Sequence, residues 1–531
     1  MDTKALRQKI LDLAIRGKLV PQDPNDEPAS VLLERIRTEK LQMVKDGKLK
    51  PKDIKNDTVI FKGDDNLHYE KFSDGSVKFC DFESDYELPN NWVWCNLGLL
   101  FNHNTGKALN SANSEGKTLT YITTSNVYWN RLELDDLKSM PFTDSEIEKC
   151  TIKKGDLLVC EGGDIGRAAI WNFDDEIRIQ NHLHRLRAYD DIQTAFYYYV
   201  LYAFKLSKKI NGNGIGLQGL SSNALHNIIV PVPPIEEQKN IVMLIEKLML
   251  SIDNIESHKN ILSACMNNTK AKILDLAIRG KLVPQNPNDE PASVLLERIR
   301  AEKEERIKQG KIKRNKKESV IFKGSDNSYY EKINGEVFCI DEEIPYDIPD
   351  TWTWMRLENC CVKEIRRGKS PKYKENSNVL VFAQKCNTKY NGIDVSLAQY
   401  LDETALKRYP ADEYMQDGDV VINSTGTGTL GRVGIYRNID NTTGLSIVPD
   451  SHVTVIRGFS CINSHYLYAF MKAHQRELEK KGEGSTNQKE LKPLTLKEML
   501  IAIPPLSEQK RIDKSINIAF SRFAVIEERL N

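Results

Sequence analysis

An internal repeat constrains this chain more than any other feature. The letters ILDLAIRGKLVPQ occupy residues 10–22 and again residues 273–285, which is a shift of 263 residues. Further repeats follow in the same order: NDEPASVLLERIR (25–37 and 288–300), VIFKG (59–63 and 320–324) and a Pro…Trp-x-Trp signature (89–94 and 349–354). The chain of 531 residues therefore consists of two equivalent halves.

Between these repeats the two halves diverge. From about residue 97 to 230 and from about 357 to 503 they share little beyond Gly-Asp, Gly-Arg and Pro-Pro landmarks. The sequence thus predicts a constant frame that carries two different variable modules.

A heptad pattern indicates what the frame is made of. After Pro233-Pro234, apolar residues recur at alternating steps of four and three, which is typical of a coiled coil. They are Ile241, Ile245, Leu248, Ile252, Ile255, Leu262, Met266, Ile273 and Leu276. We expect one long helix from about residue 235 to 280, followed by a stop at Gly280 and Pro284.

The chain termini contain the second copy of this helix. Pro504-Pro505 repeats the start, but the chain stops at Asn531, the equivalent of residue 260, while Met1 is the equivalent of residue 264. We therefore expect a composite helix from about 507–531 and 2–17, packed antiparallel to the central one. The predicted fold class is α+β: two modules of mixed α/β character separated by a long antiparallel two-helix coiled coil, in a circular pseudo-two-fold repeat.

Composition limits the location and the chemistry. No apolar run approaches the length of a membrane-spanning helix. The ten cysteines include no CxxC pair, which argues against disulfides and a zinc site and favours a reducing compartment. We expect a soluble, cytoplasmic protein. Its 75 basic and 75 acidic residues lack the excess of positive charge that a lone DNA-binding domain usually has.

On these features the chain resembles the specificity subunit of type I restriction-modification systems over essentially its full length. The PPxxEQ helix start (Pro233, Pro234, Glu237, Gln238; Pro504, Pro505, Glu508, Gln509), the long repeat and the two divergent modules carry the resemblance. It divides the chain into 1–20 and 505–531 (the two parts of the composite helix), 234–283 (the central helix), and 21–233 and 284–504 (two target-recognition domains, each with a leader segment).

The resemblance also implies a function and partners. Each module would read one half of an asymmetric, bipartite site in double-stranded DNA, and the helices would set the gap. Two modification subunits would use S-adenosylmethionine to methylate adenine N6, and two restriction subunits would use ATP and Mg²⁺. A coiled-coil scaffold without DNA specificity stays as the alternative.

Two Gly-rich loops are the first candidate DNA contacts. Gly426, Gly428 and Gly431 match GxGxxG, but the first copy reads GGxxG and a strand-like run follows, so we expect a loop close to DNA instead of a dinucleotide site. Arg167 and Arg432 end these loops, and each could bind guanine or form a structural ion pair.

The full set of candidates consists of polar side chains in loops beside strand-like segments. In the first module it comprises Lys107, Asn110, Lys117, Thr124, Ser125, Asn126, Arg167, Gln180 and Asn181. In the second module it comprises Arg366, Arg367, Lys369, Lys372, Lys374, Gln384, Lys385, Asn387, Asn423, Thr425, Thr427, Thr429 and Arg432.

Motifs for catalysis are missing from the sequence. Neither Pro-Pro follows the Asn that an adenine methyltransferase needs, and no GxxxxGK[ST] phosphate loop is present. His182 and His184 have no acidic or cysteine companion at ligand spacing, so we expect no metal site. The sequence therefore predicts a non-catalytic recognition subunit whose cofactors belong to its partners.

Overall fold

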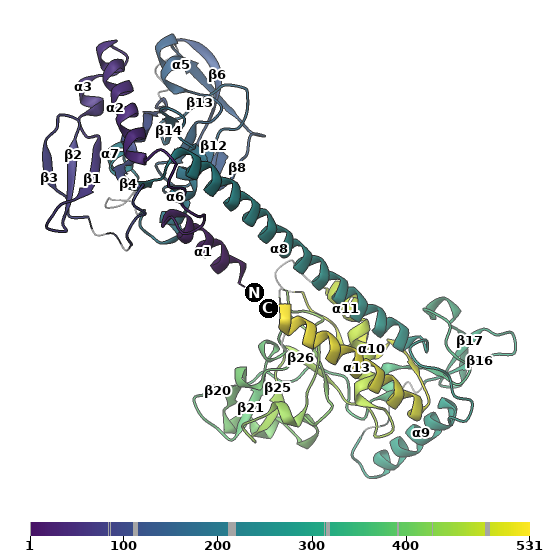
Figure 1. Ribbon diagram of the computed structural model, residues 1–531. Coiled ribbons are helices and arrows are strands. Elements are labelled where there is room, and N and C mark those ends of the chain that lie inside the picture. The colour runs from purple at the N-terminus through teal and green to yellow at the C-terminus, as the bar shows by residue number, and fades with distance from the viewer. Residues whose placement is uncertain are drawn as a thin grey trace. The chain divides into compact units, whose positions relative to one another are not determined.

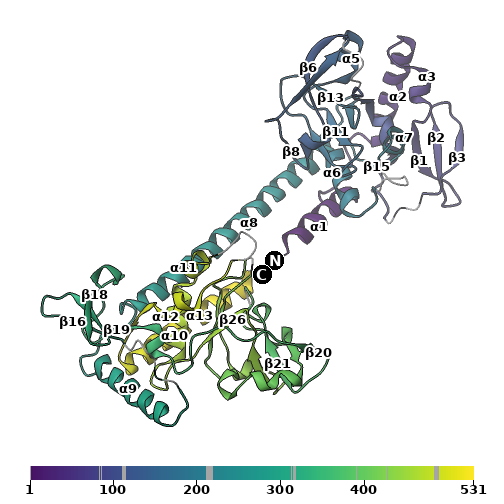
Figure 2. The same cartoon turned by 180° about the vertical axis from the view of Figure 1, so that it is seen from behind.

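The computed structural model describes residues 2–82, 84, 86–109, 115–210, 219–312, 314, 319–389, 392–426, 428–483 and 489–530. It forms two compact units, Met1–Lys259 and Asn260–Asn531, which are drawn in Figures 1 and 2 and are described separately below. One helix, α8 (Ile235–Ile278), contributes residues to both units. In the described part of the chain, no helix is long and apolar enough to cross a membrane.

Unit 1 mixes helices and short strands. Its other helices are α1 (Thr3–Ile15), α2 (Ala29–Lys45), α3 (Pro51–Ile54), α4 (Leu97–Leu100), η1 (Thr124–Asn126), α5 (Asp144–Cys150), α6 (Thr194–Leu206) and α7 (Ser222–His226). Its strands are β1 (Thr58–Lys62), β2 (His68–Phe72), β3 (Val77–Phe79), β4 (Val93–Asn96), β5 (Phe101–Thr105), β6 (Lys117–Ile122), β7 (Val127–Tyr128), β8 (Arg131–Leu132), β9 (Lys138–Phe142), β10 (Thr151–Ile152), β11 (Leu157–Cys160), β12 (Ala168–Ile170), β13 (Ile177–Ile179), β14 (Leu183–Ala188) and β15 (Ile229–Val232).

Unit 2 repeats this order with more 3₁₀ turns. Its helices are α9 (Ala292–Lys308), η2 (Asp341–Glu343), η3 (Leu357–Cys360), η4 (Gln384–Cys386), η5 (Val395–Leu397), η6 (Glu403–Arg408), η7 (Ala411–Glu413), η8 (Asn438–Asp440), α10 (Ser464–Ala473), α11 (Gln475–Lys480), α12 (Pro493–Lys497) and α13 (Leu506–Leu530). Its strands are β16 (Ser319–Lys323), β17 (Tyr329–Ile333), β18 (Glu336–Cys339), β19 (Thr353–Arg356), β20 (Tyr373–Lys374), β21 (Val379–Phe382), β22 (Gln399–Leu401), β23 (Val420–Asn423), β24 (Val433–Ile435), β25 (Ser446–Pro449), β26 (Val453–Ile456) and β27 (Leu500–Ile503).

The two variable modules have related sheets that differ at their edges. In unit 1 the sheets have the orders β10-β13-β6-β9 and β12-β11-β14-β5, and in unit 2 the orders β20-β22-β21-β25 and β24-β23-β26. Each module contains one parallel pair, β6 with β13 and β21 with β25, among antiparallel neighbours. The predicted combination of helices with short strands is therefore present in both halves.

The leader segments differ in how their strands join. In unit 1 the order is β15-β4-β1-β2-β3, whereas in unit 2 the sheets β16-β17-β18 and β19-β27 are separate. Backbone pairing of β1 with β4 joins the strands in unit 1, and beside it the Asn96 side chain accepts the Thr58 N–H at 3.1 Å and donates to the Asn56 carbonyl at 2.6 Å. Its counterpart Arg356 instead donates to Glu331.

Helix α8 forms over nearly the predicted residues and has an antiparallel neighbour within each unit. In unit 1 Arg7 of α1 lies 2.6 Å from Asp253. In unit 2 Lys270 of α8 lies 2.8 Å from Glu527 of α13. The predicted apolar seam is only partly buried, since Ile255 remains 41% and Leu262 40% exposed. The seam therefore packs toward the two ends of α8, not along its whole length.

Three of the repeated motifs meet at one place in unit 1, which we call the helix-start junction. The Trp92 indole N–H donates to Glu237 at 2.8 Å, and the Gln22 amide donates to the same carboxylate. Gly17 has a φ of +64°, and a Cβ there would lie 2.5 Å from Pro89, so a larger residue would not fit. Burial raises the pKa of Glu237, although both hydrogen bonds oppose this.

The second helix-start junction repeats these contacts in unit 2. The Trp352 indole donates to Glu508 at 2.9 Å and the Gln285 amide donates to it at 2.5 Å. Gly280, with a φ of +67°, lies against Pro349 in the same way. The repeated sequence therefore encodes the start of a long helix and its attachment to the leader segment.

The glutamine of PPxxEQ attaches the same helix start to the variable module. In unit 1 the Gln238 amide donates to the Pro233 carbonyl at 2.8 Å and accepts the Gln193 N–H at 3.1 Å. In unit 2 Gln509 accepts the Asn463 N–H at 2.8 Å. Both glutamine side chains are fully buried, so their hydrogen bonds are needed to offset desolvation.

Candidate nucleic-acid interface

The Gly-Asp landmark of each module is part of its core. Asp156 is 1% exposed and forms two hydrogen bonds to Arg187, at 2.8 and 2.6 Å. Asp419 is 0% exposed and forms two to Arg457, both at 2.6 Å. Such bidentate pairs fix geometry as well as charge. They hold the start of β11 and of β23, the strands that lead into the Gly-rich loops.

The Gly-rich loops reverse the chain between two antiparallel strands. Gly163 and Gly166 have φ values of +72° and +77°, and Gly428 and Gly431 both have +75°. A Cβ on Gly431 would lie 2.6 Å from the backbone nitrogen of Glu479. Strand β24 follows the second loop, which confirms the expectation that no phosphate-binding helix begins there.

In unit 1 the loop lies beside η1 and the turn before β14, and we call this group the first recognition corner. It consists of residues 124–126, 161–167 and 180–182. The Glu161 N–H donates to the His182 carbonyl at 2.9 Å. The Arg167 guanidinium donates to the Thr124 carbonyl at 2.6 Å and lies 4.8 Å from the Tyr128 ring.

In unit 2 the equivalent residues form the second recognition corner, which consists of 384–387, 424–426, 428–432 and 450–452. The Ser424 N–H donates to the His452 carbonyl at 2.8 Å, as Glu161 does in the first corner. The Arg432 guanidinium donates to the Asn387 carbonyl at 2.8 Å. The two corners therefore share backbone connections while their surface side chains differ.

Five sequence candidates turn out to lie inside the protein. Lys107, Asn126, Gln180, Asn387 and Asn423 are each 9% exposed or less. Lys107 donates to the Pro141 carbonyl and to Glu146, both at 2.7 Å. Asn423 donates to the Gln384 carbonyl at 3.1 Å and accepts from Asn387 at 3.2 Å. Asn387 and Asn423 hold the second recognition corner together, and Lys107 joins β9 to α5. Contact of any of the five residues with DNA stays a prediction.

The candidate arginines are also engaged within the protein. Arg167 and Arg432 donate to backbone carbonyls, and among the residues that the structure describes neither has an acidic partner, the ion pair that was one of their two expected roles. Arg366 lies 2.5 Å from Glu413, and Arg367 lies 3.0 Å from Glu490. Guanine binding by any of them would require these contacts to be exchanged.

The remaining described candidates are accessible or half-buried. They are Lys117, Thr124, Ser125, Asn181, Lys369, Lys372, Lys374, Gln384, Lys385, Thr425 and Thr429. Of these, Thr124, Ser125, Asn181, Gln384, Lys385, Thr425 and Thr429 lie in or directly beside the recognition corners. Asn110 and Thr427 fall outside the described residues. No contact with DNA is tested for any of them, so their binding role stays a prediction.

Comparison with known proteins identifies the family. A family model described as the type I restriction modification DNA specificity domain matches residues 89–263 and 349–531. The two matches cover more than half of the chain. The chain belongs to the type I restriction-modification DNA specificity family.

Relatives in this family extend along the chain. It is 29% identical over 414 residues to the Type I restriction enzyme EcoAI specificity subunit of Escherichia coli, over 67% of this chain and 62% of that protein. It is 25% identical over 608 aligned positions to the EcoEI specificity subunit of the same species, over 99% of this chain and 90% of that one. The match thus covers less than two thirds of the length of the EcoAI specificity subunit.

A solved structure supports the fold. A chain from work on the complex assembly and conformational transition of the type I R-M system has a TM-score of 0.54 and 17% identity, over 84% of this chain and 94% of that one. At this identity the likeness concerns the fold alone. It supports the mixed helix and strand content of the two units.

Histidines at the recognition corners were not among the predicted DNA contacts. His182 lies 3.5 Å from Glu161, with 56% of its side chain exposed. In the second corner, His452 Nδ1 and Thr425 Oγ1 share a hydrogen bond of 2.6 Å. In the sequence, His182 follows Gln180 by two residues and His452 follows Asp450 by two residues. This shared spacing could have identified the two histidines as equivalent positions.

His184 has a different environment from His182. It is 0% exposed, its Nδ1 lies 3.0 Å from His103 Nε2, and its Nε2 lies 2.8 Å from the Leu220 carbonyl. His182 precedes β14 and is exposed, whereas His184 lies within β14 and is buried. Within the described ranges, no three His, Cys, Asp or Glu side chains are grouped so that they could hold a metal ion.

Proposed function

We propose that this chain selects the DNA sequence for a type I restriction-modification complex, with each recognition corner reading one half of an asymmetric, bipartite site. The observation that carries the proposal is that the corners share a backbone framework but differ in accessible side chains. A common framework with different side chains suits two modules that do the same task on different sequences.

The accessible side chains have chemistry suited to base edges. In the first corner Ser125, Glu161 and His182 offer hydroxyl, carboxylate and imidazole groups, and in the second Lys385, Thr425 and His452 offer ammonium, hydroxyl and imidazole groups. Phosphate contacts position a protein on DNA, whereas hydrogen bonds to base edges in the major groove specify sequence. We therefore assign half-site choice to these residues and positioning to lysines such as Lys372 and Lys374.

Helix α8 is the proposed spacer between the two half-sites. Its 44 residues, at about 1.5 Å per residue, correspond to about 66 Å of helix. Half-sites on one face of B-DNA recur about every 34 Å, so a helix of this length is sufficient to set a gap of fixed size. The composite helix from α13 and α1 would complete this spacer as an antiparallel coiled coil and close the pseudo-two-fold repeat.

Catalysis in this proposal belongs to partner subunits. Two modification subunits would methylate adenine N6 with S-adenosylmethionine, and two restriction subunits would use ATP and Mg²⁺ for cleavage. The chain itself, with no net charge, would depend on these partners for part of its attraction to DNA.

Single-molecule methylation sequencing tests the proposal. The chain is expressed with its neighbouring modification subunit in a host without DNA methylation, and a bipartite N6-methyladenine motif that depends on the chain is the expected result. His182→Ala should relax one half of the motif and His452→Ala the other. Methylation of the same sites without the chain would contradict the recognition role and favour a scaffold, as would equal damage to both halves by either variant.

A further inference from the structure

A carboxylate in the first recognition corner has the wrong charge for a surface that approaches DNA phosphates. Glu161 begins the Gly-rich loop 161–167, and 31% of its side chain is exposed. The family model that matches this region is described as a DNA specificity domain. Because phosphates repel a carboxylate, Glu161 weakens binding to DNA unless the DNA offers it a hydrogen-bond donor.

The backbone shows which residue takes the place of Glu161 in unit 2. Besides the histidine carbonyls described above, each corner has a leucine N–H that donates to the residue in question. Leu220 donates to the Glu161 carbonyl at 2.7 Å, and Leu491 donates to the Ser424 carbonyl at 2.8 Å. Two matching backbone hydrogen bonds therefore make Glu161 and Ser424 equivalent positions.

The side chains at these equivalent positions differ in chemistry and in burial. Ser424 is 0% exposed, and its hydroxyl shares a hydrogen bond of 2.7 Å with Thr454. The Glu161 carboxylate instead reaches the surface, where it lies 3.5 Å from His182. The first corner thus presents a group that only accepts hydrogen bonds, at a place where the second corner has a buried hydroxyl.

Two glycines beside Glu161 are not required by the fold. Gly162 has no positive φ, and a Cβ on it would meet no atom of the described residues within 4 Å. A Cβ on Gly219 would make only ordinary contacts, at 3.6 and 3.8 Å from Glu161 atoms. Glycine is common where another molecule approaches the backbone closely. These glycines leave the space beside Glu161 open to the edge of a base.

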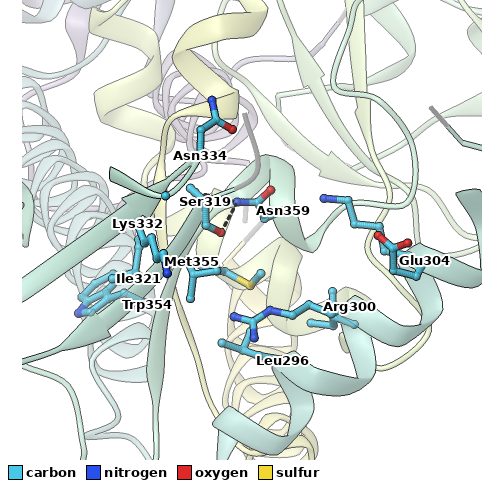
Figure 3. Close-up of a pocket in the computed structure, with 14 residues that line it drawn as sticks. Leu296, Arg300, Glu304, Ser319, Ile321, Lys332, Asn334, Trp354, Met355 and Asn359 are labelled. Carbon is cyan, nitrogen blue, oxygen red and sulfur yellow. Dashed lines mark hydrogen bonds between the residues drawn. The ribbon is translucent and has the colours of Figure 1, made fainter. Parts of the chain in front are cut away.

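Positively charged side chains elsewhere in the protein have a different capacity for binding DNA. In the leader of unit 2, side chains of α9, β16, β17 and β19 line a cavity of about 580 Å³, and Arg300 and Lys332 are among them (Figure 3). Cations contact phosphates of any sequence, so they add affinity without selecting a base. A carboxylate cannot bind phosphate in this way, and the amines of the bases are the donors that DNA offers it.

We propose that Glu161 accepts a hydrogen bond from the exocyclic amine of one cytosine or adenine, in the major groove of the half-site that unit 1 reads. The inference rests on the proposed function and names the chemical group that this corner recognises. Cytosine N4 and adenine N6 are donors in the major groove, whereas guanine and thymine present acceptors there. An acceptor facing Glu161 would be repelled, so the carboxylate selects one base of a pair against the other.

Removal of single amines from the DNA, combined with substitution of Glu161, provides the test. Methylation sequencing first identifies the bipartite site. In duplexes with this site, each adenine or cytosine is then replaced, one at a time, by the same base without its exocyclic amine, except for the adenines that are methylated. Competition binding measures the affinity of the chain in complex with its modification subunit for each duplex.

At one position of one half-site, removal of the amine should weaken binding by the wild type at least about fivefold. The same removal should change binding by Glu161→Ala less than about twofold, because the acceptor is already absent. Asp164→Ala is the matched control in the same loop, since Asp164 is paired with Lys205 at 2.8 Å, and it should respond as the wild type does. Equal responses of wild type and Glu161→Ala at every position would overturn the inference.

Two further variants separate direct contact from a structural role. His182→Ala should keep the response at the position that Glu161 reads, and loss of that response would show that Glu161 only orients the histidine. Gly162→Ala should weaken binding to this half-site severalfold without lowering stability, and binding at wild-type affinity would contradict the close approach. The other half-site should respond normally in every variant, which reports that the chain is folded.

Failure of this inference is distinct from failure of the proposed function. Methylation that does not depend on the chain would overturn the proposed function and the inference with it. A bipartite motif that depends on the chain, together with unchanged responses in Glu161→Ala, would overturn the inference alone.

Discussion

The helix-start junctions and the recognition corners are both present twice. The two junctions are nearly identical, whereas the two corners differ in their side chains. Both junctions use the same side chains at nearly the same distances, 2.8 and 2.9 Å between indole nitrogen and carboxylate. The corners keep a backbone hydrogen bond, 2.9 Å at Glu161 and 2.8 Å at Ser424, and an arginine that donates to a backbone carbonyl, while the other side chains around them change.

The difference has a physical cause. A junction carboxylate is buried, and its donors Trp92 and Gln22 must have the right shape and the right N–H groups. A recognition corner needs only its backbone path, which β-strand pairing and glycines with positive φ maintain. Surface side chains on that path can change without loss of stability, and this freedom allows two half-sites to differ.

The largest test of this comparison removes the indoles. Trp92→Ala and Trp352→Ala should each lower the free energy of unfolding of their own unit by about 3–5 kcal/mol. Each variant leaves a cavity and a buried carboxylate with one donor fewer. Unit-resolved amide exchange measures the loss, and Trp→Phe controls should lose less, about 1–3 kcal/mol. Clearly unequal losses in the two units would break the equivalence of the junctions.

A second test separates buried from accessible residues within one corner. Asn423→Ala should cost about 1–3 kcal/mol of stability, because the Gln384 carbonyl and the Asn387 amide would lose a partner. Thr425→Val should change stability by less than about 0.5 kcal/mol and act on binding to one half-site. Thermal unfolding and competition with DNA altered in either half-site measure both effects. If Thr425→Val lowers stability, Thr425 supports the structure of the corner and is not only a DNA-binding side chain.

A third test compares how the two units respond to acid. Unit 1 has a buried pair of histidines, and unit 2 has no equivalent pair. Burial lowers the pKa of His103 to about 3, and the electrostatic effects of the neighbouring His184, His226 and Arg185 act in the same direction. Its counterpart region in unit 2, residues 361–365, contains no histidine. An unfolded histidine titrates near 6.5, so stability present above that pH is lost as the pH falls, by about 1.4 kcal/mol per unit.

Amide exchange at pH 7.5 and 5.5 should therefore show unit 1 weakening more than unit 2. His103→Gln should remove most of the difference between the units. An equal response of both units in the wild type would show that His103 is not the responsible group.

The smallest test concerns an ion pair that one junction has and the other lacks. Arg511 lies 2.6 Å from Asp289 and lowers the pKa of that carboxyl. In unit 1 the residue equivalent to Arg511 is Asn240, and burial raises the pKa of Asp26, the equivalent of Asp289. Arg511→Asn should cost less than about 1 kcal/mol, because partly exposed pairs contribute little. Salt titration of wild type and variant gives a control, since their difference should shrink at high ionic strength.

The repeats predicted more of the frame than of the site. Helix α8 was expected from 235 to 280 and forms over Ile235–Ile278, because heptad spacing and the Pro-Pro start are local signals. The exposed middle of its seam was missed, since periodicity shows which residues share a helix face but not which neighbour covers them. Spacing also could not show that Lys107 and Asn423 are buried, because polar residues in loops look alike in sequence.

By itself the sequence determined the duplication, the long helix and membership in the DNA specificity family, since identity and periodicity do not depend on contacts. Only the tertiary structure decided which polar residues hold the recognition corners together and which reach solvent. It also brought His182 beside Glu161 and His452 beside Thr425, and it placed Phe61, Tyr69 and Phe79 in one row. These decisions depend on strand register and burial, which are set by partners distant in the chain.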